Sequence, residues 1–145
     1  MNDRLSVEQV LKEKGFFVTT TSGVSMMPLF SDRRDRIVIK PAAERLKKYD
    51  VPLYRRGESL VLHRIIKVRE NDYVIRGDNC VLREIVSDEQ IVGVLAEFYR
   101  KDKHYTVNDF SYRLYSRLWV FISPVIIAVK KIRMLLSAIY HKIVK

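Results

Sequence analysis

The chain has 145 residues, of which 48% are hydrophobic and 30% are charged. This length suffices for one domain with its own core, and the composition excludes a disordered or collagen-like chain. The formal net charge of +10 is unevenly distributed. Residues 1–99 hold 17 basic and 15 acidic side chains, whereas residues 100–145 hold 10 and 2, so most of the net charge lies at the C-terminal end.

The pattern of apolar residues predicts a short helix followed by strands. The sequence Ser-Val-Glu-Gln at 6–9 is a capping box and Gly15 is a typical helix stop, so we expect a helix over about 6–14. Further on, β-branched and aromatic runs separated by turn signals predict strands. These runs are 16–21, 36–40, 51–55, 60–68, 73–76 and 90–99. Their spacing indicates a mainly β fold, a small irregular antiparallel domain over residues 1–104.

Residues 105–145 have a helical pattern, and Pro124 indicates a break between two helical pieces. Beyond Pro124, apolar residues recur every three or four positions and basic residues fill the remaining arc. The apolar run around Pro124 is shorter than the roughly 20 residues that span a bilayer. We therefore expect a basic amphipathic tail that lies on an anionic membrane surface through residues 118–145. Packing on the protein's own core or on a second copy, and a short re-entrant span, are the alternatives.

Other partners and compartments are less favoured. A basic helix also suits nucleic acid, but the apolar face of this tail is too large for a solvent-exposed DNA-binding arm. Residues 1–14 lack the apolar stretch of a signal peptide, which predicts synthesis in the cytoplasm without a cleavable export signal and leaves the side of the membrane open. His104 and His141 lie apart from other ligand-type residues, so neither a metal nor another cofactor is expected.

Three short motifs along the chain carry, in order, a hydroxyl, an imidazole and a carboxylate. Ser25 lies in Ser-Gly-Val-Ser-Met-Met-Pro, His63 in Leu-His-Arg and Asp78 in Gly-Asp-Asn. A serine hydroxyl becomes a nucleophile only beside a base, and a neutral imidazole with a pKa of about 6.5 is such a base. We therefore pair Ser25 with His63. Cys80, the single cysteine, is a weaker candidate nucleophile, and a small buried thiol is its plainer interpretation.

The order of these motifs resembles that of the type I signal peptidases and the related LexA-type self-cleaving repressors. The resemblance covers roughly residues 16–100 and rests on the segments SGVSMMPLF, DRIVIK, KKYDVPLYR, LVLHRIIKV, YVIRGDNC and IVGVLAEFY. His63 is similar to the histidine of the endoplasmic reticulum and archaeal forms. The resemblance implies a serine endopeptidase that cleaves leader or signal segments from exported peptides. Ser25 would form an acyl-enzyme, and His63 would be its general base.

The resemblance also implies roles for neighbouring residues. The carboxylate that orients His63 is either Asp78 or Glu84, and the sequence leaves both open. The backbone N–H of Ser25 is expected in the oxyanion hole; Gly23 replaces a serine that many members use there, so Ser22 or another backbone group would be the second donor. Four further residues complete the expectation: Met26 and Pro28 would shape the peptide-binding groove, and Asp35 and Asp50 would be structural.

Two other functions remain open at this point. The first is a LexA-type regulatory module that cleaves itself or a partner, although no helix-turn-helix fits before the first strand. The second is a non-catalytic relative that binds peptides. Only 24 residues precede Ser25, and they include no membrane span, which favours an enzyme for a dedicated group of substrates over a general signal peptidase.

Overall fold

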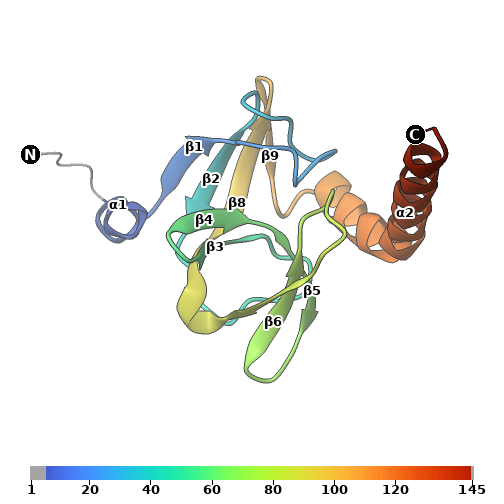
Figure 1. Cartoon of the computed structure of the whole chain (residues 1–145). Helices are drawn as coiled ribbons and strands as arrows, with labels where there is room; N and C mark the ends of the chain where they lie inside the picture. The colour runs from blue at the N-terminus through green and yellow to red at the C-terminus, as the bar shows by residue number, and fades with distance from the viewer. Residues whose placement is uncertain (1–5, 145) are drawn as a thin grey trace, which may run out of the picture.

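The computed structural model describes residues 6–144, so that Met1 to Leu5 and Lys145, the last lysine of the predicted tail, lie outside it. The described chain is mainly β, with strands in two antiparallel sheets, a short first helix and a long last one (Figure 1), as predicted. The elements are α1 (Val7–Lys14), β1 (Phe17–Thr20), β2 (Arg36–Lys40), β3 (Pro52–Arg56), β4 (Ser59–Leu62), β5 (Arg64–Val68), β6 (Asp72–Arg76), β7 (Glu84–Ser87), the 3-10 turn η1 (Asp88–Gln90), β8 (Ile91–Arg100), β9 (Lys103–Thr106) and α2 (Phe110–Ile143).

Helix α1 begins and ends as its sequence predicts. The hydroxyl of Ser6 accepts from the backbone N–H of Gln9, and the Gln9 side chain accepts from the backbone N–H of Ser6. Gly15 ends the helix with a φ of 77°, a left-handed conformation that costs glycine little. Leu11 is the buried residue of α1 and joins the core of the first sheet.

The first sheet is built around the long strand β8. Its order is β1-β2-β8-β3-β4, and β9 also pairs with β8. Ile39, Leu53, Leu95 and Phe98 form the centre of its core, and they come from β2, β3 and β8. Strands β1 and β4 end the order, so each has a free edge within it.

The second sheet, β5-β6-β7, has its own cluster of buried residues, which includes Ile65, Tyr73, Ile75 and Val86. The expected continuous strand over 60–68 is wrong, because it divides at His63 into β4 in the first sheet and β5 in the second. Strands β7 and β9 were not expected from the sequence. Strand β9 extends the first sheet across the boundary expected at residue 104.

Helix α2 is one continuous element, so the expected division into two pieces at Pro124 is wrong. A proline has no N–H for the carbonyl of Val120, four residues earlier. The hydroxyl of Ser123 donates to that carbonyl at 2.8 Å and so supplies the missing donor. Figure 1 shows the helix changing direction about midway along its length, as a proline commonly causes. Across residues 6–144, no helix is both long and apolar enough to cross a membrane.

The ion pair between Arg64 and Asp78 joins β5, the turn after β6 and helix α2. Both side chains are buried, and the guanidinium makes two bonds to the carboxylate, at 2.8 and 3.0 Å. The remaining guanidinium nitrogen donates to the hydroxyls of Tyr112 and Ser116 on α2 and to the carbonyl of Tyr49. Burial is the largest single influence and would lower the pKa of Arg64, but the charge of Asp78 and the contacts with Asp78 and Tyr112 together raise it.

Removal of the Arg64 charge should therefore be costly. We expect Arg64→Met to lower the free energy of unfolding by about 3–5 kcal/mol, because it leaves the Asp78 carboxylate buried without its counter-charge. Arg69→Met is the matched control, since Arg69 pairs with Asp72 at the surface and exposed pairs contribute less than about 1 kcal/mol. Urea denaturation measures both. Equal, small losses would show that the buried pair does not hold the fold together.

Candidate active site

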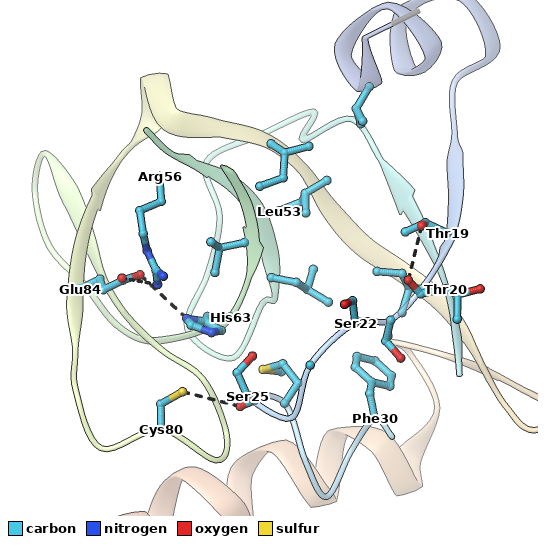
Figure 2. A pocket seen from close by; sticks show the side chains of 18 of the residues that line it. Thr19, Thr20, Ser22, Ser25, Phe30, Leu53, Arg56, His63, Cys80 and Glu84 are labelled. Atoms are coloured by element: carbon cyan, nitrogen blue, oxygen red, sulfur yellow. Dashed lines mark hydrogen bonds and ion pairs between the residues drawn. The ribbon is translucent and has the colours of Figure 1, made fainter. Parts of the chain in front are cut away.

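A pocket of about 800 Å³ lies between strands β1 and β4 and the loops that carry the three motifs. Figure 2 shows that Ser25 and His63 both face this pocket, with the side chain of Ser25 directed towards the imidazole. Much of the remaining wall is apolar and includes Phe17, Phe30, Leu53, Leu60, Leu62 and Leu82. The structure thus brings together two residues that are 38 positions apart in the sequence.

Ser25 lies in a compact turn that the Gly-Asp-Asn motif holds in place. The backbone N–H of Asn79 donates to the carbonyl of Ser25 at 2.8 Å, and the Asn79 amide donates to the carbonyl of Val24 at 3.1 Å. Within the turn, Met27 donates through its backbone N–H to Val24. These bonds fix the backbone on both sides of the Ser25 side chain.

Gly77 permits the close approach of the serine and histidine segments. A Cβ atom at this position would lie 2.7 Å from the carbonyl oxygen of Ser25 and 3.0 Å from Cδ2 of His63. Both distances are too short for any larger residue to fit without moving its neighbours. Glycine at 77 is therefore required by the packing of the site, in addition to its place in a turn.

His63 lies where the chain passes from β4 in the first sheet to β5 in the second, and only 7% of its surface is exposed. Burial is the main cause that lowers the pKa of His63 below its ordinary value. The positive charge of Arg56 lowers it further, whereas the charges of Glu84 and Asp78 oppose the shift. The imidazole is therefore neutral at neutral pH, as a general base must be.

Tyr54 and Glu84 lie behind the imidazole. The Nδ1 atom of His63 is 3.2 Å from the hydroxyl of Tyr54 and 3.9 Å from Oε2 of Glu84, and the Tyr54 hydroxyl donates to that carboxylate. Because the Tyr54 hydroxyl donates its hydrogen bond to Glu84, its oxygen is left to accept a hydrogen bond from the Nδ1–H of His63. This assignment leaves Nε2 of the neutral ring with its lone pair free, which is the tautomer that general-base catalysis needs.

Glu84 is ionised, although burial tends to raise its pKa. The ion pair with Arg56 and the hydrogen bond from Tyr54 outweigh burial, so the pKa of Glu84 is lowered. Of the two carboxylates that the sequence left open, Glu84 is the one beside His63. The carboxylate of Asp78 is engaged with Arg64 and also accepts from the hydroxyl of Tyr115 at 2.8 Å.

Of the two residues expected to shape the peptide-binding groove, Met26 lines the pocket and Pro28 does not. Met26 is 5% exposed and belongs to the core of the first sheet, yet it also lines the pocket. Pro28 lies instead beside a second cavity with Leu29 and Phe98. Ser22 lines the main pocket.

The backbone N–H of Gly23 donates to the carboxylate of Asp32 at 2.7 Å. That N–H is therefore already engaged and does not serve as a second oxyanion donor.

Cys80 lines the same pocket, with its sulfur 3.9 Å from the carbonyl of Ser25. Burial is the main cause that raises the pKa of this thiol, which keeps it protonated and disfavours it as the nucleophile. Asp35 is fully buried and accepts from the backbone N–H groups of Ser31 and Lys101. Asp50 accepts from the backbone of Lys47, and burial raises its pKa.

Sequence reasoning did not identify Tyr54 and Arg56 as site residues. Both lie on β3, where Tyr54 pairs with Val61 and Arg56 with Ser59 across the hairpin to β4. The only signal was Arg-Gly at 56–57, which predicts a turn and hence a hairpin. The register of that hairpin would have brought Tyr54 towards the segment that carries His63.

Comparison with protein-family models and with curated proteins finds no match for this chain. Within residues 6–144, no group of three or more histidine, cysteine or acidic side chains is arranged to hold a metal ion. The chemistry of the site therefore has to be argued from its own residues.

The charges around His63 make its titration predictable. We expect a midpoint below about 6.5 for the wild type. Glu84→Gln removes a negative charge that favours the imidazolium and should lower the pKa of His63 further, whereas Arg56→Gln should raise it. NMR titration of the ring Cε1–H signal measures this, with assignment by His63→Gln. The signal of His104, whose partner Glu97 is unchanged, is the internal control. Shifts of the same sign in both variants would contradict this arrangement.

Proposed function

We propose that this protein is a serine endopeptidase in which Ser25 is the nucleophile and His63 the general base. The observation that carries the proposal is the neutral, buried imidazole that shares one pocket with Ser25 and has its Nδ1 atom beside Tyr54 and Glu84. A hydroxyl, a base and a group that orients the base are the three parts that nucleophilic catalysis by serine needs.

In this mechanism the hydroxyl oxygen of Ser25 attacks the carbonyl carbon of the substrate peptide bond, and its proton passes to Nε2 of His63. The tetrahedral intermediate collapses, the C–N bond breaks, and the imidazolium gives its proton to the leaving amine. A water molecule then gives a proton to His63 and attacks the carbonyl carbon of the acyl-enzyme. The C–O bond to Ser25 breaks, His63 returns the proton to the Ser25 oxygen, and the acid is released. Tyr54 and Glu84 keep the ring oriented, and the charge of Glu84 stabilises the imidazolium.

The oxyanion requires donors that are already in place. The backbone N–H of Ser25 is the first, because the turn from Val24 to Met27 and the bonds from Asn79 fix its direction. With the N–H of Gly23 engaged by Asp32, we take the hydroxyl of Ser22, which lines the pocket, as the second donor, and another backbone group is the alternative. Removal of one such donor typically costs about 10²–10³-fold in kcat.

The shape of the pocket suits an extended, apolar peptide segment. Strands β1 and β4 end the order of the first sheet, and residues of both line the pocket. An extended chain gains main-chain hydrogen bonds along such an edge, and the apolar wall accepts its side chains. Leader and signal segments are substrates of this kind, and we propose them as the substrate class.

A peptide-binding protein without catalysis is the second candidate. It is favoured by one observation: the Gly23 N–H is bonded to Asp32. Of the backbone N–H groups of Gly23 and Ser25, only that of Ser25 is then left for the oxyanion. The two functions share the pocket and differ only in whether Ser25 reacts.

Incubation with candidate leader peptides, followed by mass spectrometry of the products, separates these functions. We expect Ser25→Ala and His63→Ala to lose cleavage to a similar extent, because the two residues act as one proton-transfer unit. Tyr54→Phe should lose less, since Glu84 remains 3.9 Å from Nδ1. Ser59→Ala and His104→Ala, changed at exposed positions outside the pocket, are the matched controls. Cleavage that persists in Ser25→Ala would exclude the proposed nucleophile.

We also propose that α2 rests on an anionic membrane surface. Its range contains no acidic residue and carries the cations Lys131, Arg133 and Lys142 on exposed positions. Large apolar side chains on the same half of the helix are more than 40% exposed: Val125, Val129, Ile132, Met134, Leu135, Leu136, Ile139, Tyr140 and Ile143. An exposed apolar face with flanking cations matches the boundary between acyl chains and anionic headgroups.

This prediction is tested with the full chain, since the first turns of α2 pack on Arg64 and Asp78. The triple variant Lys131→Glu, Arg133→Glu, Lys142→Glu should lose co-sedimentation with vesicles that contain phosphatidylserine, because it replaces attraction by repulsion. A triple change at exposed cations of the β-domain, Lys12→Glu, Lys14→Glu and Lys67→Glu, matches it in net charge. Equal binding of wild type and the α2 variant would contradict a membrane role for this helix.

A further inference from the structure

We propose that Lys130 on α2 is a positioning residue for Ser25, so that the C-terminal helix holds the nucleophile in its reactive place. The inference rests on the proposed function and adds a long-range control to the same site. It is carried by a continuous series of hydrogen bonds from α2 through the Gly-Asp-Asn turn to the Ser25 turn.

Lys130 contacts Asn79 at two points. Its ammonium group donates to the backbone carbonyl of Asn79 at 2.9 Å and to the side-chain oxygen of Asn79 at 2.6 Å. A cation at the amide oxygen fixes which end of the amide faces α2, and the NH₂ group is thereby directed at the carbonyl of Val24. The backbone N–H of Asn79 donates to the carbonyl of Ser25. In this series of hydrogen bonds, Asn79 is therefore the one residue between Lys130 and Ser25.

Two further contacts hold the same turn from α2. The indole N–H of Trp119 donates to the backbone carbonyl of Asp78 at 2.9 Å, and the hydroxyl of Tyr115 donates to the Asp78 carboxylate. On the other side of the turn, Arg76 donates to the hydroxyl of Ser123 at 2.5 Å. The helix thus contacts residues 76, 78 and 79, and Lys130 is the contact that points towards the nucleophile.

Lys130 differs from its neighbours on the helix. It is partly buried, whereas Lys131 and Arg133 are exposed. It does not line the pocket, so its removal should leave the binding of substrate side chains unchanged. Without its two bonds to Lys130, the Asn79 amide would be less firmly held against the carbonyl of Val24, and the Ser25 turn would be free to shift. A shift of about 1 Å at a reacting group costs on the order of 10²-fold in rate.

The test compares Lys130→Met with Lys131→Met, which removes the same charge one position along the helix. In an assay without membranes, so that the proposed membrane contact of Lys131 plays no part, we expect kcat for a soluble leader peptide to fall about 10- to 100-fold in Lys130→Met with KM unchanged within about twofold. Lys131→Met should then behave as wild type. Lys130→Arg keeps a cationic donor and should recover most of the loss. Asn79→Asp keeps the oxygens that Lys130 binds but lacks the donor to Val24, so it should lose kcat as Lys130→Met does.

A second measurement does not require activity. Hydrogen–deuterium exchange of the peptide that covers residues 22–30 should increase in Lys130→Met and stay at the wild-type level in Lys131→Met. Unchanged kcat and unchanged exchange in Lys130→Met, or equal losses in both variants, would overturn the inference.

The two proposals fail differently. If wild type and Ser25→Ala both fail to cleave while exchange responds to Lys130→Met, the peptidase assignment falls and the coupling of α2 to this turn stands. If wild type cleaves and Lys130→Met matches it in rate and exchange, only the coupling falls. Thermal unfolding of each variant shows whether a loss comes from the fold or from the turn.

Discussion

The buried pair of Arg64 and Asp78 is the constraint on which the site depends. Asp78 lies between Gly77, where a Cβ atom would collide with Ser25 and His63, and Asn79, which holds the Ser25 turn. Arg64 follows His63 directly and begins the second sheet. By fixing Asp78 to Arg64, the pair brings the three motifs to one place and also attaches α2 through Tyr112 and Ser116. An unpaired charge on either of these two buried side chains would be strongly unfavourable, so packings in which Arg64 and Asp78 are apart are disfavoured.

The two carboxylates near His63 have different tasks because their surroundings differ. Asp78 is buried against a guanidinium and has a structural role. Glu84 is partly exposed, pairs with Arg56 and reaches the imidazole through Tyr54. A carboxylate at this distance favours the imidazolium, while burial disfavours it. In the proposed mechanism the imidazole is therefore neutral before reaction, and the charge of Glu84 would stabilise its protonated form when the proton of Ser25 arrives.

Local signals in the sequence predicted the parts of the fold that depend on local chemistry. The capping box at Ser6 and the β-branched run at 36–40 are of this kind, and so are the motifs around Ser25, His63 and Asp78. The break at His63 was not predictable, because 60–68 has the composition of a single strand and no turn signal, and only tertiary pairing divides it between two sheets. Tyr54 was missed because its role depends on hairpin register. The helix through Pro124 was missed because the carbonyl of Val120 is satisfied by a side chain that also accepts from Arg76, 47 residues away.

The two halves of helix α2 differ in what their side chains contact. Its first half offers hydroxyl, indole and phenol groups to Arg64, Arg76 and Asp78, and these polar contacts are buried or partly buried. Its second half leaves apolar side chains in solvent, where their exposure is unfavourable unless another surface covers them. Lys130, near the start of the second half, bonds to the turn that holds Ser25. The proposed seating of the apolar face on a bilayer would therefore act on the Ser25 turn through Lys130.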